Sequence, residues 1–240
     1  MADFFGPDVA CRYDRDHCNQ TDEEVRKTVE FLAEFAGSGH ALEFAIGTGR
    51  VALPLSDSGI KVSGIELSEA MVGELRRKLG GNEIPVAMGD MAQTRIEGRF
   101  SLVYLVFNTL SNLTSQDAQV ACFRNAAAHL EDGGYFVVEN AIPRFGGLAN
   151  DTTKMAFDRS DNHWGIDEID VVTQRGTSHH VWLEETGPKL MALPFRFVWP
   201  SEMDLMAALA GLKLVERWQD WWRTPLTAES KAHVSVWRKH

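Results

Sequence analysis

The hydrophobic positions of this 240-residue chain follow two periods that alternate along the sequence. In residues 22–36, Val25, Val29, Leu32 and Ala36 recur at helical spacing. Thr21 precedes this run with Glu24 three positions later, the form of a capping box, so we expect a helix over 22–36 that ends at glycine 37. Short apolar runs that follow predict strands, at residues 40–45, 61–66, 84–88, 101–107 and 135–139.

Helical patterns separate these predicted strands. A short helix is expected at 50–56, a second begins at Ser68 with Met71, Leu75 and Leu79 on one face, and a third runs from Thr114 to about residue 130. The run 101–107 is almost continuously apolar, which is typical of a central parallel strand covered on both faces. The alternation of strand and helix predicts an α/β fold, a parallel sheet with helices on both sides.

The alternation stops after Asn140. Strand-like segments at 168–173, 178–184 and 191–199, with a turn near Gly176, predict an antiparallel β cap inserted after the fifth strand. A helix from Ser201 to Gly211 and strands at 212–218 and 233–237 then close the chain. We therefore expect one domain made of an N-terminal lid (1–20), a core (21–140), a cap insertion (141–199) and a C-terminal part (200–240).

Charge and cysteine content narrow the function classes. Lys and Arg number 24 and Asp and Glu number 34, so the formal net charge is 24 − 34 = −10, which disfavours nucleic acid as a partner. No apolar run is long enough for a membrane span and the first residues have no signal-peptide pattern, so we expect a cytoplasmic protein. Cys11, His17 and Cys18 lack a fourth ligand at a recognisable spacing, and no metal site is predicted.

The segment Gly47-Thr48-Gly49 lies between a predicted strand and a predicted helix, where glycines let the backbone approach a ligand closely. Glu66 ends the next strand, at the position where a carboxylate holds a ribose diol. This pairing indicates a nucleoside-bearing cofactor. The same segment also fits a dinucleotide fingerprint, but Glu43 near the turn would repel a pyrophosphate.

Four segments together, 42–50, 64–71, 89–91 and 101–108, resemble the class I S-adenosylmethionine-dependent methyltransferase family. The resemblance covers about residues 21–140 and implies a Rossmann-like, seven-stranded, mostly parallel sheet and S-adenosylmethionine as cofactor. Two alternatives stay open at this point: a nicotinamide-dependent oxidoreductase, and a non-catalytic module that binds S-adenosylmethionine.

The resemblance also implies roles for single residues. Glu66 would accept hydrogen bonds from the ribose hydroxyls, Met71 would pack on the adenine, and Asp90 with the Met91 amide would bind the adenine edge. Ala45 stands where the family most often has glycine, and its single methyl group should fit there if φ is negative. The full set expected to bind the cofactor is Tyr13, Glu43, Ala45, Gly47, Gly49, Glu66, Leu67, Met71, Asp90, Met91, Phe107 and Asn108.

The predicted cap and lid are rich in aromatic side chains, which suits a small organic methyl acceptor. The layout resembles small-molecule methyltransferases such as the amino-sugar N-methyltransferases, and it implies N- or O-methylation. Trp164, Trp182 and Arg196 are the residues expected to contact the acceptor. If the acceptor is a hydroxyl, a base is needed, and the candidates are His163, His179 and His180. An amine needs alignment and a route for its proton.

Overall fold

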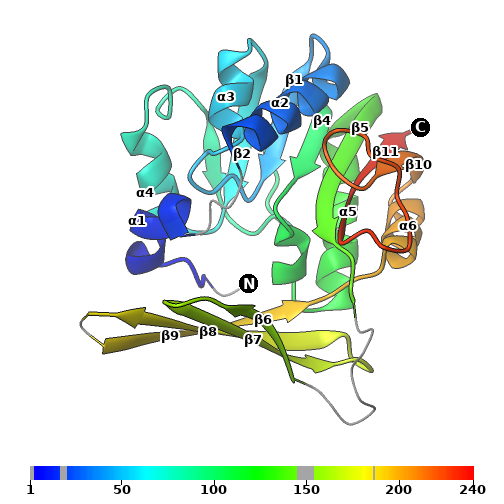
Figure 1. Ribbon diagram of the computed structural model, residues 1–240. Coiled ribbons are helices and arrows are strands. Elements are labelled where there is room, and N and C mark those ends of the chain that lie inside the picture. Colours follow the sequence, from blue (N-terminus) through cyan, green and yellow to red (C-terminus); the bar gives the residue numbers. More distant parts are fainter. Residues whose placement is uncertain (1–2, 17–20, 145–153, 186) are drawn as a thin grey trace.

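Two sheets organise the computed structural model, which describes residues 3–16, 21–144, 154–185 and 187–240 (Figure 1). The larger has seven strands in the order β10-β11-β5-β4-β1-β2-β3, and the smaller has four in the order β6-β7-β8-β9. Within the larger sheet, β11 is antiparallel to both β5 and β10, whereas β1 to β5 pair in parallel. The predicted mostly parallel sheet and the antiparallel sheet inserted after strand five are thereby confirmed. The strands of the larger sheet are β1 (His40–Phe44), β2 (Lys61–Glu66), β3 (Val86–Met88), β4 (Phe100–Leu105), β5 (Leu130–Ala141), β10 (Leu212–Trp218) and β11 (Ala232–Lys239).

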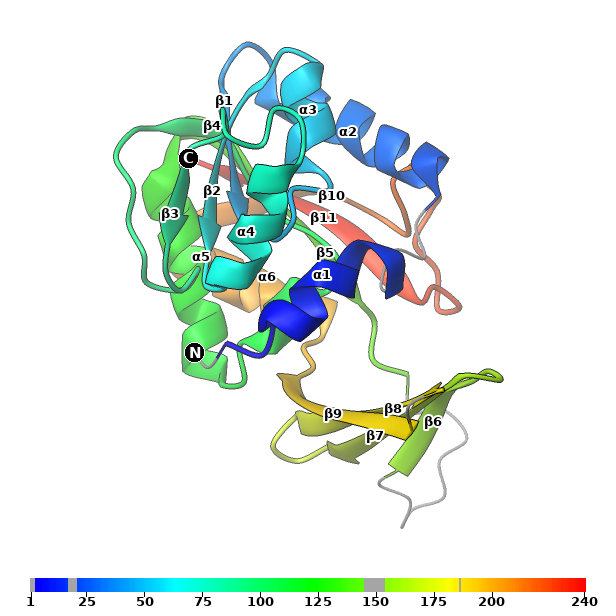
Figure 2. The same ribbon diagram turned by 90° about the vertical axis from the view of Figure 1, so that its left-hand side faces the viewer.

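Helices cover both faces of the larger sheet, as expected for strands that are apolar on both sides (Figures 1 and 2). Side chains alternate along β1, so Ala41 packs with Phe31 on one face, while Leu42 and Phe44 pack with Phe123 on the other. The first face is covered by α2 (Asp22–Ala36), α3 (Ala52–Asp57) and α4 (Glu69–Arg77), and the second by α5 (Gln116–His129) and α6 (Pro200–Leu209).

Helix α2 begins with the predicted capping box. The Glu24 amide donates to Thr21 Oγ1 over 3.2 Å, and the Thr21 amide donates to Glu24 Oε2 over 2.6 Å. Two amides that the helix leaves without partners are satisfied by this exchange. The helix therefore has the bounds that the sequence indicated, and it ends before Gly37.

Two helix ends differ from the prediction. Helix α4 stops at Arg77, because the chain turns back so tightly that a Cβ at Gly81 would lie 1.9 Å from the Leu75 carbonyl oxygen. Leu79 is in consequence 98% exposed and does not extend the buried face. Helix α5 is capped by Ser115, whose Oγ accepts from the Ala118 amide over 3.2 Å, rather than by Thr114.

The strand after α5 also begins earlier than predicted. It starts at Leu130 and runs through Gly133 and Gly134, whereas the sequence predicted a strand only from residue 135. A Cβ at Gly134 would lie 3.0 Å from the Phe100 carbonyl oxygen, so this glycine permits close pairing with β4.

The N-terminal segment and the cap contain elements that the sequence did not reveal. Residues expected to be irregular form helix α1 (Pro7–Asp16), followed by positions 17–20, including His17 and Cys18, which lie outside the described residues. The cap sheet, defined here as the four strands that follow, has an unpredicted first strand and a turn at 171–174 instead of near Gly176. Its strands are β6 (Lys154–Arg159), β7 (His163–Asp170), β8 (Arg175–Glu184) and β9 (Gly187–Arg196).

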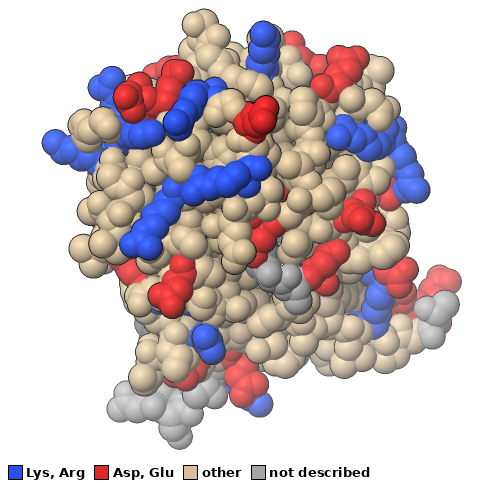
Figure 3. Space-filling view, turned by 180° about the vertical axis from the view of Figure 1, so that it is seen from behind, with Lys and Arg blue, Asp and Glu red and all other residues tan. Residues whose placement is uncertain are grey.

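The described surface carries side chains of both charge signs. No helix within the described ranges is long and apolar enough to cross a bilayer. On the face shown in Figure 3, Lys and Arg side chains lie among Asp and Glu side chains instead of forming one continuous basic surface.

Candidate active site

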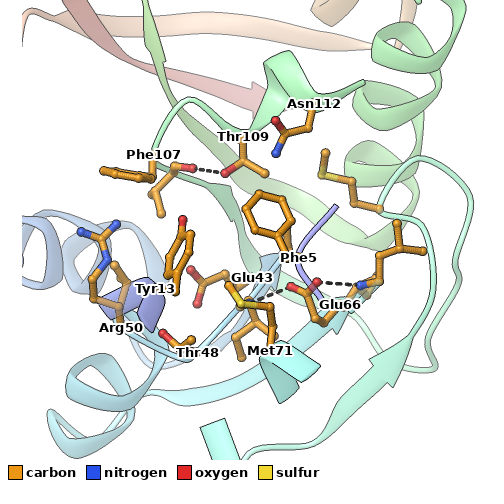
Figure 4. A pocket seen from close by; sticks show the side chains of 18 of the residues that line it. Phe5, Tyr13, Glu43, Thr48, Arg50, Glu66, Met71, Phe107, Thr109 and Asn112 are labelled. Atoms are coloured by element: carbon orange, nitrogen blue, oxygen red, sulfur yellow. Dashed lines mark hydrogen bonds between the residues drawn. The ribbon is translucent and has the colours of Figure 1, made fainter. Parts of the chain in front are cut away.

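A pocket opens at the carboxyl ends of β1, β2 and β4, where ligands bind in open α/β sheets (Figure 4). Its cavity measures about 870 Å³ with the open space at its mouth included. The pocket is lined by Asp3, Phe4, Phe5, Tyr13, Glu43, Ala45, Ile46, Gly47, Thr48, Arg50, Val51, Ile65, Glu66, Leu67, Met71, Gly89, Met91, Val106, Phe107, Thr109 and Asn112.

The loop after β1 gives the pocket its floor through residues in left-handed backbone conformations. Gly47 has φ 58° and Gly49 has φ 75°, and a Cβ at Gly49 would come within 2.3 Å of Leu75 Cδ1. Glycine suits both positions for that reason. Ala45 also has a positive φ, 53°, so the condition under which its methyl group fits without strain is not met. Its left-handed conformation places about 1–2 kcal/mol of strain at the pocket wall.

Glu66 is held by three backbone amides at the end of β2. Its Oε1 accepts from the amides of Leu67 and Ser68, each over 2.9 Å, and its Oε2 accepts from the Gly47 amide over 2.8 Å. An ionised carboxylate has about four acceptor positions, so Oε2 keeps one for a ligand hydroxyl. Burial raises the pKa of Glu66, and the three amides oppose that shift. The carboxylate is therefore oriented before any ligand arrives.

Glu43 lies deeper in the same pocket and is only 3% exposed. The Tyr104 hydroxyl donates to Glu43 Oε2 over 2.9 Å. Burial raises the pKa of Glu43 from 4.5 to about 8, while the Tyr104 hydrogen bond and the charge of Arg50 oppose the rise. Between these two pH values the folded chain keeps a proton on Glu43 that the unfolded chain loses. The stability that this proton contributes is complete below pH 4.5 and is lost as the pH rises to about 8.

The turn after β4 forms the wall opposite the glycine loop. Phe107 and Asn108 both have positive φ, 58° and 57°. The Phe107 amide donates to Glu139 Oε2 over 2.8 Å, and the Arg50 guanidinium lies 4.5 Å from the centre of the Phe107 ring. Asn108 Oδ1 accepts from the Ala141 amide over 3.0 Å. Phe107 therefore lines the pocket. Asn108 does not belong to the pocket lining and instead holds the turn through its hydrogen bond.

The turn after β3 contributes less directly than the resemblance implies. Gly89 and Met91 line the pocket, whereas Asp90 does not. Asp90 Oδ1 accepts from the Ala92 amide over 2.8 Å and so shapes the turn. Met71, from α4, lies against the glycine loop, with its Cε 3.4 Å from the position of a Cβ on Gly47.

The N-terminal segment covers the pocket from a third side. Phe4, Phe5 and Tyr13 line it, and the rings of Phe5 and Tyr13 meet edge to face at 5.8 Å. Next to Tyr13, Asp14 Oδ1 accepts from the Thr48 hydroxyl over 2.6 Å, and its Oδ2 lies 2.5 Å from Lys78 Nζ. Sequence reasoning missed Arg50, Thr109 and Asn112, for which the only signal was their position directly after a strand.

The cap residues predicted to contact the acceptor separate onto two faces of the cap sheet. His163, His180 and Trp182 share one face, since His163 pairs with Trp182 and Gly165 pairs with His180. Trp164 and His179 point to the other face, where Trp164 is 49% exposed. None of these five residues belongs to the pocket lining among the described residues.

Arg196 does not reach the pocket either, which corrects the expectation that it binds the acceptor. It is 3% exposed, and its Nη2 lies 2.7 Å from Glu202 Oε1. The same guanidinium donates to Gln174 Oε1 over 2.9 Å and to Gln119. Because Gln119 and Glu202 belong to α5 and α6, Arg196 joins the cap sheet to the core.

Comparisons with known proteins agree with this geometry. Residues 41–134, which include the glycine loop and Glu66, match the family described as a methyltransferase domain. The solved CcbJ methyltransferase from Streptomyces caelestis is 37% identical, with 98% of each chain covered and a TM-score of 0.86. The chain belongs to the class I S-adenosylmethionine-dependent methyltransferase family.

Two curated relatives extend the comparison. The cypemycin N-terminal methyltransferase of a Streptomyces species is 25% identical over 206 residues, 81% of each chain. A dTDP-3-amino-3,6-dideoxy-alpha-D-glucopyranose N,N-dimethyltransferase from Streptomyces fradiae is 30% identical over 143 residues, 58% of this chain and 55% of that protein. Family membership decides between the alternatives that the sequence left open: the protein is a methyltransferase that uses S-adenosylmethionine as its methyl donor.

The pocket residues fit this cofactor. The pocket is lined by the carboxylates of Asp3 and Glu66, by the Glu43 carboxyl group, which keeps its proton near neutral pH, and by one cationic side chain, Arg50. The two carboxylates suit a ligand with a sulfonium and an ammonium group. The loop at Gly47 leaves open the space that a side chain would enter. We expect Glu66 to hold the ribose hydroxyls and Met71 to lie along the adenine, and the cofactor supplies an electrophilic methyl group.

Proposed function

We propose that the acceptor of the methyl group is an amino nitrogen of a small molecule. The observation that carries the proposal comes from two curated relatives, which match 81% and 58% of this chain and are named as a cypemycin N-terminal methyltransferase and an amino-sugar N,N-dimethyltransferase. The acidic lining of the pocket supports it, because carboxylates attract a cationic amine. An amine acceptor also agrees with Thr109 and Asn112 at the Phe107 side, whose neutral polar groups orient a ligand by hydrogen bonds.

In this function the chain's own residues align the reactants. The glycine loop and Glu66 fix the cofactor, and Phe107 closes the wall beside the site of transfer. The aromatic rings of Phe5 and Tyr13 exclude water from the mouth. Alignment of an amine with the methyl carbon is the main source of rate enhancement in such a displacement.

The acceptor class is tested by turnover. Purified protein is incubated with S-adenosylmethionine and each of three probes: an amino sugar, its hydroxyl analogue, and a short peptide with a free N-terminus. Mass spectrometry measures S-adenosylhomocysteine and the methylated product. We expect product from one or both amines and none from the hydroxyl analogue. Faster methylation of the hydroxyl analogue than of either amine contradicts the proposal.

A second measurement tests the cofactor site separately. Each hydrogen bond to a charged group contributes about 1.5–3 kcal/mol, so Glu66→Ala should weaken S-adenosylmethionine binding about ten- to a hundredfold in isothermal titration. Glu83→Ala, which removes the same charge from an exposed turn, is the matched control and should bind like the wild type. Unchanged affinity in Glu66→Ala would show that Glu66 does not hold the ribose.

A further inference from the structure

Five polar side chains form a continuous hydrogen-bonded chain across the cap sheet. Asp158 Oδ2 lies 2.5 Å from His163 Nδ1, His163 Nε2 lies 3.0 Å from His180 Nδ1, and His180 Nε2 lies 3.1 Å from Ser178 Oγ. Ser178 in turn makes a side-chain hydrogen bond with Asp167. The chain thus runs from one carboxylate to another through two imidazoles and a hydroxyl.

Counting hydrogens shows that this chain has a place for one additional proton. With both carboxylates ionised, Asp158 requires a hydrogen on His163 Nδ1, and Asp167 requires that Ser178 donates to it. Ser178 Oγ then accepts a hydrogen bond from His180 Nε2, which must therefore carry a hydrogen. A third hydrogen lies between His163 Nε2 and His180 Nδ1. The two imidazoles therefore hold three hydrogens when every bond is made, one more than a neutral pair carries.

The rings are packed in a way that fixes this pairing. The rings of His163 and His180 stack at 5.2 Å with an interplanar angle of 24°, and those of His180 and Trp182 stack at 5.2 Å with an angle of 7°. Phe157 meets His180 edge to face at 5.3 Å. The hydrogen-bonded chain is held as one rigid unit, with the side chain of His163 only 16% exposed.

The face that carries this chain is also the face that meets helix α1. Ser178, His180, Trp182 and Glu184 alternate along β8 and therefore point to the same side of the sheet. Glu184 Oε1 lies 2.7 Å from Arg12 Nη1 in α1, the helix whose Tyr13 lines the cofactor pocket. In addition, β9 contacts the short helix η1 (Thr109–Asn112), which lines the pocket at the Phe107 side. Figure 1 shows the cap sheet below the core, on the side of α1 and η1.

The charged groups on this face favour a cationic acceptor. From β6 and β7 come Asp158 and Asp167, and from β8 comes Glu184, which is paired with Arg12. From β9 comes Lys189, whose Nζ lies 3.9 Å from Asp8 of α1. Hydrogen bonding to His163 lowers the pKa of Asp158, so it stays ionised beside the imidazoles, whereas burial raises the pKa of Asp167.

We propose that Asp158, His163, His180, Ser178 and Asp167 form a proton relay that removes one proton from the acceptor ammonium group before methyl transfer. An alkylammonium, whose ordinary pKa is about 10, has no lone pair at neutral pH and cannot attack. The Asp167 carboxylate takes this proton, Asp167 passes a proton to Ser178 Oγ, and Ser178 passes its own to His180 Nε2, which completes the hydrogen-bonded chain. The nitrogen lone pair then forms the N–C bond, and the electron pair of the broken C–S bond stays on sulfur. The product leaves as a methylated ammonium, and the relay returns its proton to solvent.

This relay rests on the proposed amine acceptor, and kinetics test its use. In His180→Gln we expect kcat for the amine to fall about a hundredfold near pH 7 and to recover as the pH rises, because the free amine then supplies its own lone pair. Asp158→Asn should shift the pH profile of kcat, and S-adenosylmethionine affinity should stay within about twofold in both variants. His179→Gln is the matched control, because His179 is the next residue but faces away, 3.7 Å from Glu168. If His180→Gln keeps kcat within about threefold of His179→Gln from pH 6 to 9, the relay is overturned.

A measurement independent of turnover separates failure of the relay from failure of the proposed function. Nuclear magnetic resonance on the full chain with labelled histidine, assigned with His163→Gln and His180→Gln, follows the ring nitrogens from pH 5 to 9. We expect the two rings to take up one proton together. If they titrate independently while the wild type methylates amines, the relay alone is wrong. If they titrate together while no amine probe is methylated, the proposed acceptor is wrong, and the pair's role in catalysis falls with it.

Discussion

Replacing Arg196 with methionine should destabilise the junction between the cap sheet and the core while leaving the cofactor site intact. The guanidinium is almost fully buried, with a side chain 4% exposed, and it lies 2.7 Å from Glu202 and 2.9 Å from Gln174. Removing one partner of a buried ion pair costs about 3–5 kcal/mol. Glu202 keeps its bonds from Gln174 and Gln116, each from 2.7 to 2.8 Å, so we expect the lower end, about 3 kcal/mol.

For a chain of this length, about 3 kcal/mol lowers Tm by about 6–12 °C. Circular dichroism during heating and urea unfolding measure the change, and isothermal titration should give wild-type affinity for S-adenosylmethionine. Arg196→Lys keeps the charge without the forked geometry of the guanidinium, so its Tm should lie between those of the wild type and of Arg196→Met. The double variant with Glu202→Gln should lose less stability than the sum of the single changes, because no unpaired buried charge remains. A Tm within about 1 °C of wild type together with a raised KM for the acceptor refutes this reasoning and returns Arg196 to the acceptor site.

Two further predictions concern the pocket wall. Ala45→Gly should raise the free energy of unfolding by up to about 1.6 kcal/mol in urea titration, because about 1–2 kcal/mol of left-handed strain is relieved and about 0.4–1 kcal/mol is lost to the greater entropy of the unfolded chain. A loss of stability speaks against a positive φ at Ala45. Glu43→Gln should remove the pH dependence that the buried carboxyl group creates, so the stability of the wild type relative to this variant should decline between pH 5 and 8, by at most about 1.4 kcal/mol per pH unit. Parallel curves contradict the raised pKa.

The parts of the cofactor site that the sequence predicted are those whose geometry is set by neighbours in the chain. Strand, glycine turn and helix follow one another within residues 40–57, and the turn needs glycine at Gly47 and Gly49 because of their positive φ. Glu66 is recognisable because it ends a strand whose apolar run is visible in the sequence. Local periodicity and turn chemistry are sufficient for such features.

The elements that the sequence did not reveal depend on contacts between distant segments. Helix α1 has ten residues, too few for an isolated helix to be stable in water, and it is held by the ion pair of Arg12 with Glu184, 172 positions later. Strand β6 contains a register shift between Ala156 and Asp158, which interrupts the alternation by which a strand is recognised. Arg196 looked like an acceptor ligand because its partners, Gln119 and Glu202, are not its neighbours in sequence.

The same reasoning explains the shape of the pocket wall at Phe107. Phe107 adopts a left-handed conformation that phenylalanine does not favour by itself, whereas asparagine tolerates it at position 108. The strain at Phe107 persists only where surrounding contacts impose it. Here the contacts come from the end of the neighbouring strand β5: Glu139 accepts from the Phe107 amide, and the Ala141 amide donates to Asn108 Oδ1. Strand β5 leads directly toward the cap insertion, and β9 returns from the cap against η1, beside the same turn. The pocket wall at Phe107 is therefore shaped by the strand that leads to the cap, which couples the geometry of the pocket to the part of the chain proposed to receive the acceptor.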